Sequence, residues 1–261
     1  MEARAYLKRI GYQGSLNPSL QALKSLHRRH LLSVPFENLD IHTGRPIILD
    51  IEAFYDKLVN ERRGGYCYEL NACFAWLLKK LGFRVAMLSA KVAIKDRRFS
   101  PEFDHMTLLV SLRERWLADV GFGDSFTEPK QIDTGRAQED SGRTYRLGMG
   151  NQTRVLLRYD ESSESWQPQY SFTLRPRRLS DFAQRNLYQQ TSPNSHFTQG
   201  PLISKLTRTG RVTLTDKKLI ITRGELRTQY RVKTVKEFRR LLAKNFRIGL
   251  DTRESVHQRM P

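Results

Sequence analysis

The chain has 261 residues, of which 39% are apolar, 10% aromatic and 28% charged. This composition is typical of a soluble globular protein, and the length suggests about two domains of ordinary size. The 45 Lys and Arg outnumber the 27 Asp and Glu to give a formal charge of +18. Such a charge favours anionic partners: nucleic acid, an anionic membrane surface or a phosphorylated small molecule.

Several classes of protein are excluded. No run of about 18 apolar residues is present to span a bilayer, and residues 1–9 lack the apolar stretch of a signal peptide. The two cysteines, Cys67 and Cys73, are too few for a disulfide framework or, alone, for a structural zinc site. We therefore expect a reducing cytoplasmic location and no metal site.

The first third of the chain is predicted to be helical. Asn17 followed by Pro18 indicates a helix start, and Asp50 precedes a second helical pattern. The strongest pattern follows the glycine pair at 64–65, where apolar residues recur at helical spacing. These residues are Leu70, Cys73, Phe74, Leu77, Leu78 and Leu81.

After residue 82 the helical pattern gives way to short runs of β-forming residues. These runs, at 85–94, 106–112, 116–122, 153–159 and 170–174, predict an antiparallel sheet or barrel. A short helix capped by Ser180 is expected at 181–188. Beyond the turn-rich segment 191–195 we expect strands at 211–214, 218–222 and 229–232. The spacing of Thr234 and Glu237 then indicates a capping box and a last helix.

Cys67 is a candidate nucleophile because it follows the glycine pair and falls at the start of the strongest helix. Unpaired backbone N–H groups and the helix dipole favour a thiolate at such a position, and Arg62 and Arg63 would add to the effect. The alternative is that Cys67 is a small buried apolar residue. Cys73 lies on the apolar stripe, about 9 Å along the helix, so it is expected in the core and not in a disulfide with Cys67.

His105 and Asp119 are candidate partners of that thiol. His105 directly precedes the apolar run 106–110, and Asp119 is the one acid in the run 116–123. In an antiparallel pair the two side chains would face the same side. A tight turn at 113–115 would place His105 opposite Gly123, whereas a ladder centred near Leu112 would place it opposite Asp119. The alternatives are a satisfied histidine and an ordinary strand-end carboxylate.

The other histidines and the basic residues give weaker signals. His27 and His30 have a possible metal spacing, but no third ligand with suitable spacing is evident. We therefore expect them on a solvated basic face. The basic pairs are scattered along the chain without a zinc-finger or RNP-type pattern, so most are expected to be solvated surface.

Segments in order along the chain resemble the arylamine N-acetyltransferases. They are residues 63–71 (RGGYCYELN), 105–106 (HM) and 119–123 (DVGFG), with further similarity at 9–12, 34–40 and 188–197. The resemblance runs from about residue 9 to residue 200, and the last sixty residues match only in general character.

This resemblance implies an α+β fold with three domains and a papain-like Cys-His-Asp triad. The expected parts are a helical domain at 1–84 with the nucleophile, an antiparallel β-barrel domain at 85–192 with the His and Asp, and a small α/β lid at 193–261. It makes Cys67 the nucleophile, His105 the base and Asp119 the orienting acid. It also favours the register in which His105 meets Asp119.

The resemblance further implies transfer of an acetyl group from acetyl-CoA to an arylamine or arylhydrazine through an acetyl-cysteine, with ping-pong kinetics. Acetyl-CoA is then a cosubstrate, and no tightly bound cofactor is expected. Phe36 and Phe122 would line the acceptor pocket, and Gly123 would let CoA approach the backbone. The alternatives are a cysteine amide synthase or acyl-thioester hydrolase with another acyl donor, and a basic nucleic-acid-binding protein.

Overall fold

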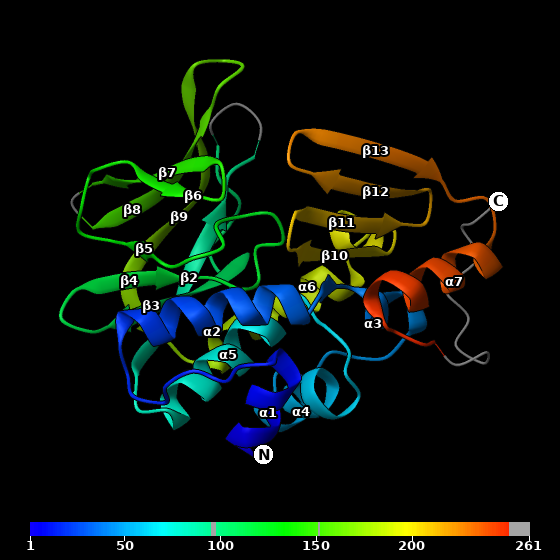
Figure 1. Ribbon diagram of the computed structural model, residues 1–261, viewed down its shortest axis with the longest axis horizontal. Helices are drawn as coiled ribbons and strands as arrows, with labels where there is room; N and C mark the ends of the chain where they lie inside the picture. The colour runs from blue at the N-terminus through cyan, green and yellow to red at the C-terminus, as the bar shows by residue number, and fades with distance from the viewer. Residues whose placement is uncertain (95–97, 151, 251–261) are drawn as a thin grey trace.

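The computed structural model describes residues 1–94, 98–150 and 152–250, and it has a helical part and two antiparallel sheets (Figure 1). The expected α+β class is therefore confirmed. The helical part is formed by α1 (Ala3–Ile10), α2 (Leu20–Ser33), α3 (Leu39–Thr43), α4 (Ile51–Tyr55), the π-helical turn η1 (Asp56–Asn60) and α5 (Cys67–Lys80).

The helix starts show which capping signals act. Asp50 caps α4 as expected, because its carboxylate accepts a hydrogen bond from Ala53 N at 2.8 Å. The start predicted at Asn17 is wrong by two residues: the hydroxyl of Ser19 caps α2 by accepting from Ala22 N at 3.2 Å. A proline precedes this cap instead of occupying the first helical turn.

Helix α5 is central to the fold. It contacts α1 and α4 on one side. On the other side it contacts the two strands of the larger sheet that come first along the chain. Neighbours on both sides explain why nearly every residue from Cys67 to Leu78 is buried, beyond the single apolar stripe that the sequence predicts. The nucleophile candidate is thus carried by one of the most rigidly packed elements.

The larger sheet has eight antiparallel strands in the order β5-β4-β3-β2-β9-β8-β7-β6. Its two end strands are joined by Gln138, whose side-chain amide accepts from Gln131 N at 2.8 Å and donates to Gln131 O at 3.0 Å. The sheet is therefore a nearly closed barrel, as expected. Its strands are β2 (Arg84–Val92), β3 (His105–Ser111), β4 (Arg115–Ala118), β5 (Lys130–Gln131), β6 (Gln138–Asp140), β7 (Arg143–Met149), β8 (Thr153–Asp160) and β9 (Ser165–Arg177).

The smaller sheet has the order β1-β10-β11-β12-β13 and includes two residues of the helical part. Strand β1 (Phe36–Glu37) pairs with β10 (Leu202–Thr207). Neither of these two strands was predicted from the sequence. The remaining strands are β11 (Gly210–Thr215), β12 (Lys218–Arg223) and β13 (Leu226–Arg231). Helix α7 (Val235–Phe246) packs on this sheet, and Thr234 caps it as expected by accepting from Glu237 N at 3.1 Å.

A helical connection links the two sheets. It begins earlier than predicted, with the 3-10 turn η3 (Leu179–Phe182), continues as α6 (Ala183–Thr191) and ends at η4 (His196–Thr198). Ser180 is not the cap; the carboxylate of Asp181 accepts from Arg178 N at 2.9 Å. Phe182 is fully buried in the same core cluster as α5, so this connection packs against the helical part.

Candidate active site

The turn before Cys67 can be formed only by glycine. A Cβ atom on Gly64 would lie 2.0 Å from Pro35 O, and one on Gly65 would lie 2.8 Å from the side chain of Glu69. Glu69 in turn accepts the N–H of Tyr66 at 2.9 Å, which closes the first turn of α5. Cys67 is therefore held at the first position of the helix, as the sequence indicates.

The thiol of Cys67 is only 3% exposed, and burial raises its pKa. Hydrogen bonds from the backbone N–H groups of Met106 and Tyr68 act in the opposite direction. The expectation that Arg63 helps to stabilise the thiolate is wrong, because its guanidinium binds carboxylates elsewhere. A buried thiol with a raised pKa needs a nearby base to lose its proton.

His105 is the candidate for such a base. The contact from Met106 N–H to the sulfur places Cys67 beside the start of β3, where His105 is the first residue. The Nε2 atom of His105 lies 2.6 Å from Oδ2 of Asp119, and both side chains are buried. This contact engages Nε2 and leaves the other ring nitrogen, Nδ1, without a side-chain carboxylate.

The strand register brings His105 and Asp119 together indirectly. Leu108 pairs with Ala118 and Leu109 with Leu117, a register midway between the two considered from the sequence. Extended by one residue, it would place Asp119 opposite Thr107, so the expectation that His105 and Asp119 are directly paired is wrong. Strand β4 ends at Ala118, and the side chains meet where the chain leaves the strand.

Asp119 remains ionised in this site. Burial alone would raise its pKa, but the His105 imidazole and the N–H groups of Asn71 and Gly121 lower it overall. The ionised carboxylate of Asp119 contacts Nε2 of His105 and so fixes the orientation of the imidazole ring.

Two positioning residues were missed by the sequence analysis. The amide of Asn71 donates to Met106 O at 2.6 Å and to Asp119 Oδ1 at 3.0 Å, and it accepts from Val120 N at 2.9 Å. Asn71 lies four residues after Cys67, on the same face of α5, and this spacing could have identified it.

His27 is the second, and its expected place on a solvated face is wrong. Like His30, it is fully buried. Its ring contacts Thr127 O through Nδ1 at 2.8 Å and accepts from Asp119 N at Nε2 at 3.1 Å. It therefore fixes both ends of the loop that follows β4.

Aromatic rings surround His105. The ring of Phe122 lies 5.1 Å from His105 and 5.0 Å from Tyr170, and it is partly buried. Phe36, the other aromatic residue expected to line the acceptor site, is 8% exposed, and its ring lies 6.0 Å from that of Phe197. Phe36 also bridges to Gly65, next to the turn that carries Cys67.

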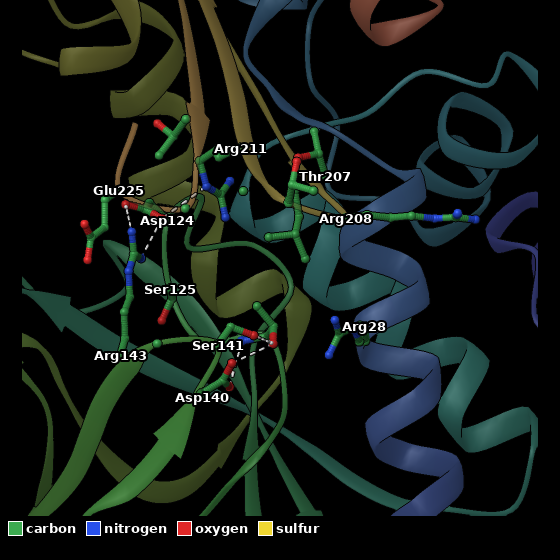
Figure 2. Close-up of a pocket in the computed structure, with 17 residues that line it drawn as sticks. Arg28, Asp124, Ser125, Asp140, Ser141, Arg143, Thr207, Arg208, Arg211 and Glu225 are labelled. Atoms are coloured by element: carbon green, nitrogen blue, oxygen red, sulfur yellow. Dashed lines mark hydrogen bonds and ion pairs between the residues drawn. The ribbon is translucent and has the colours of Figure 1, made fainter. Parts of the chain in front are cut away.

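A cavity of about 480 Å³ lies next to the loop that follows β4, between the barrel and the smaller sheet (Figure 2). Gly123 has a left-handed backbone with φ of 85°, and no atom would meet a Cβ placed there. The following residue, Asp124, lines the cavity and binds Arg143 at 2.8 Å and Arg211 at 3.1 Å. Arg28 of α2 lines the opposite wall.

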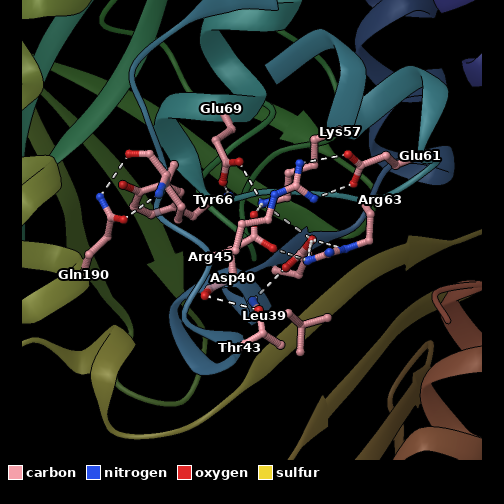
Figure 3. Close-up of polar contacts among 12 residues, drawn as sticks. Leu39, Asp40, Thr43, Arg45, Lys57, Glu61, Arg63, Tyr66, Glu69 and Gln190 are labelled. Carbon is pink, nitrogen blue, oxygen red and sulfur yellow. Dashed lines mark hydrogen bonds and ion pairs between the residues drawn. The ribbon is translucent and has the colours of Figure 1, made fainter. Parts of the chain in front are cut away.

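A buried network of charges lies behind the turn at 64–65 (Figure 3). Lys57 binds Asp40 and Glu69 at 2.7 Å each, and Arg63 binds Glu37 at 2.9 Å and Asp40 at 2.8 Å. Burial raises the pKa of Glu69 to about 7, although Lys57 opposes the shift. The network joins β1, α3, η1 and α5, so it fixes the helix start to its surroundings.

Within 1–94, 98–150 and 152–250, no group of three or more His, Cys, Asp or Glu side chains is placed to hold a metal ion. No helix of these ranges is long and apolar enough to cross a membrane.

Known proteins are similar to this chain in both sequence and fold. The model of a family described as N-acetyltransferase matches residues 19–256. The pineal gland isozyme of arylamine N-acetyltransferase from Gallus gallus is 33% identical over an alignment of 276 positions. The alignment covers 96% of this chain and 95% of that protein. The structure of the Salmonella typhimurium arylamine N-acetyltransferase has a TM-score of 0.90 at 33% identity, covering 97% of this chain and 93% of that one.

A third similar structure contains a ligand. It is the arylamine N-acetyltransferase of Mycobacterium marinum in complex with CoA, with a TM-score of 0.87, 32% identity and coverage of 95% of this chain and 93% of that chain.

Proposed function

Because the chain belongs to the arylamine N-acetyltransferase family and is therefore an acyltransferase, we propose that it transfers acetyl groups from acetyl-CoA to aromatic amines or hydrazines. The observation that carries this proposal is that Cys67 is buried at the start of α5 against the N–H of Met106, next to His105, whose Nε2 lies 2.6 Å from the carboxylate of Asp119. A free thiol, a base and an orienting acid are the groups that an acyl-cysteine mechanism requires.

In the first half of the proposed reaction, His105 Nδ1 takes the proton of the Cys67 thiol as the sulfur attacks the thioester carbonyl of acetyl-CoA. A new C–S bond forms, and the carbonyl oxygen becomes an oxyanion. We assign its stabilisation to backbone N–H groups at Cys67, because the first N–H groups of a helix have no partner within it. The oxyanion then collapses, the bond to the CoA sulfur breaks, and the CoA thiolate leaves with the proton from His105.

In the second half, the acceptor amine attacks the acetyl-cysteine. His105 takes the proton of the amine nitrogen, the bond to the Cys67 sulfur breaks, and the proton returns to that sulfur. Throughout, Asp119 holds Nε2 of His105, so that Nδ1 faces the reacting atoms. Ping-pong kinetics follow from the covalent intermediate.

We place the acceptor ring against Phe122, since its ring packs on His105 and is only partly buried. A flat aromatic amine stacks well on such a wall. We keep Phe36 as a second wall, because it bridges to Gly65 beside the nucleophile turn.

We place the CoA moiety along Gly123 and into the cavity of Figure 2. Gly123 has open space where a side chain would begin, so the pantetheine chain can pass close to its backbone. The adjoining cavity has about 480 Å³ and contains the guanidinium groups of Arg28, Arg143 and Arg211, which suit the phosphates of CoA. The CoA complex of the M. marinum relative supports this class of ligand.

The decisive experiment is mass spectrometry of the intact protein after incubation with acetyl-CoA. We expect one acetyl adduct on the wild type and on Cys73→Ala, none on Cys67→Ala, and loss of the adduct when an arylhydrazine is added. Cys73 is a matched control because it is fully buried on the same helix. An adduct on Cys67→Ala, or a stable adduct that no arylamine or arylhydrazine removes, would overturn the proposal. We also propose a cytoplasmic location, which the two free thiols support.

A further inference from the structure

A second cavity lies where the end of α7 meets the ends of α1 and α2. It has about 430 Å³, and its lining described by the structure contains five cationic side chains and no carboxylate. The cations are Arg9, Arg62, Lys205, Lys244 and Arg247. They come from four separate segments of the helical part and the C-terminal part. None of these five residues lines the cavity of Figure 2.

Lys205 is a half-buried cation that faces this cavity. Its Nζ donates to Asn245 O at 3.0 Å and lies 5.7 Å above the ring of Phe246. An ammonium group has three N–H donors, so two remain for another acceptor. Burial and the charges of Arg9 and Arg247 lower the pKa of Lys205, which shows that these cations repel one another.

Two of the arginines have a backbone conformation that side chains rarely adopt. Arg62 has a φ of 56° and Arg247 a φ of 60°, and both line the cavity. Arg247 is the left-handed C-cap of α7, where its N–H donates to Ala243 O at 3.0 Å, so the helix end accounts for this conformation. Arg9 is part of the frame, because its guanidinium donates to the carbonyl oxygens of Leu58 and Ser33 at 2.9 and 2.8 Å.

We propose that this cavity binds a phosphate-bearing anion with at least two anionic groups, such as a diphosphate, and that the bound anion ties α7 to the helical part. The carbonyl groups at the end of α7 offset part of the positive charge, but the side chains still carry five formal charges within one cavity. A multiply charged oxyanion would satisfy the free donors of Lys205 and relieve the mutual repulsion of the cations. The volume is larger than one phosphate group needs, which favours a diphosphate or a phosphorylated small molecule.

The test is calorimetric titration with inorganic pyrophosphate at constant ionic strength, together with thermal unfolding. We expect binding to the wild type with one site and a rise in Tm. The variant Lys244→Gln/Arg247→Asn should bind at least tenfold more weakly, and asparagine tolerates the left-handed backbone at 247. Lys236→Gln, an exposed neutralisation on the same helix, is the matched control and should bind like the wild type.

The proposal is overturned if the wild type does not bind pyrophosphate, or if the double variant binds it equally well. Binding that is lost in Arg28→Gln but kept in the double variant would also overturn it, because the anion would then occupy the cavity of Figure 2. The KM for acetyl-CoA distinguishes the two possible sources of the anion, a separate molecule or a phosphate of CoA. An unchanged KM in the double variant identifies an anion separate from the cosubstrate, and a raised KM identifies a CoA phosphate as the ligand.

Discussion

Gly121 offers a sharp test of the proposed active-site geometry, because it packs directly on the backbone of Cys67. In Gly121→Ala the new Cβ would lie 2.8 Å from the Cα of Cys67, 3.0 Å from its carbonyl oxygen and 2.7 Å from Asn71 Nδ2. Ordinary contacts begin at 3.4 Å, so the Cα of Cys67 must retreat by at least about 0.6 Å unless the Gly121 loop moves instead. Either movement changes the distance between the sulfur and His105.

The size of the effect follows from this displacement. Catalytic groups tolerate errors of about 0.5 Å, and a shift of 1 Å can cost about 100-fold in rate. We therefore expect acetylation of Cys67 to slow by about 10- to 100-fold. Overpacking of a buried site also costs about 1–3 kcal/mol of unfolding free energy, or about 2–4 °C in Tm for each kcal/mol in a protein of this size.

The assay is the rate of CoA release in a single turnover with acetyl-CoA and no acceptor, measured beside thermal unfolding. Gly135→Ala is the control, since no atom lies within 4 Å of its added Cβ, and it should change stability by less than about 0.5 kcal/mol. If Gly121→Ala acetylates as fast as the wild type with unchanged Tm, the close packing described here is not what positions Cys67.

Three further predictions concern the groups around the site. In Asn71→Leu three hydrogen-bond partners lose their contacts, so we expect a loss of roughly 3 kcal/mol in urea unfolding and at least tenfold slower acetylation; unchanged values would refute its positioning role. Arg63→Met removes one of the two buried cations that pair with Glu37 and Asp40 and leaves only Lys57 to them, so it should cost about 3–5 kcal/mol, whereas Arg45→Met breaks an exposed pair and should cost less than about 1 kcal/mol in the same unfolding assay. For Glu69 the folded pKa of about 7 exceeds the ordinary value of 4.5, so the native state binds more protons and stability falls as the pH rises between these values. Relative to Glu69→Gln, the wild type should lose up to roughly 3 kcal/mol between pH 4 and pH 8 at 1.36 kcal/mol per pKa unit, and parallel stability curves would contradict this.

Features set by neighbouring residues were predictable. The glycine pair and the apolar spacing after it predicted that Cys67 begins a helix. Asp50 was placed directly before a helix, and Thr234 was identified as part of a capping box. The runs of β-forming residues indicated β2, β3, β4, β8 and part of β9, but they missed the seven-residue strand β7. The two- and three-residue strands β5 and β6 are too short for any periodicity to reveal them.

Features set by contacts between distant segments were not predictable from the residues alone. His27 meets Asp119 and Thr127 across 92 and 100 residues, and nothing near it in sequence announces those partners. The resemblance favoured a contact between His105 and Asp119. The two side chains reach each other because β4 ends at Ala118, and not because the strand register places them opposite each other. The boundaries 1–84, 85–192 and 193–261 stay a prediction, and Leu39 packs within the C-terminal core cluster.

The position of β1 has a consequence for how the nascent chain matures. Glu37 N donates to Gly65 O at 2.8 Å, so β1 is attached to the turn that precedes the nucleophile. The other edge of β1 pairs with β10, in which Ser204 faces Phe36. The ribosome delivers β10 long after Cys67, and until then β1 has an open edge. The turn before Cys67 therefore gains this support only after β10 has been synthesised, so its final packing depends on a segment that is distant in the sequence.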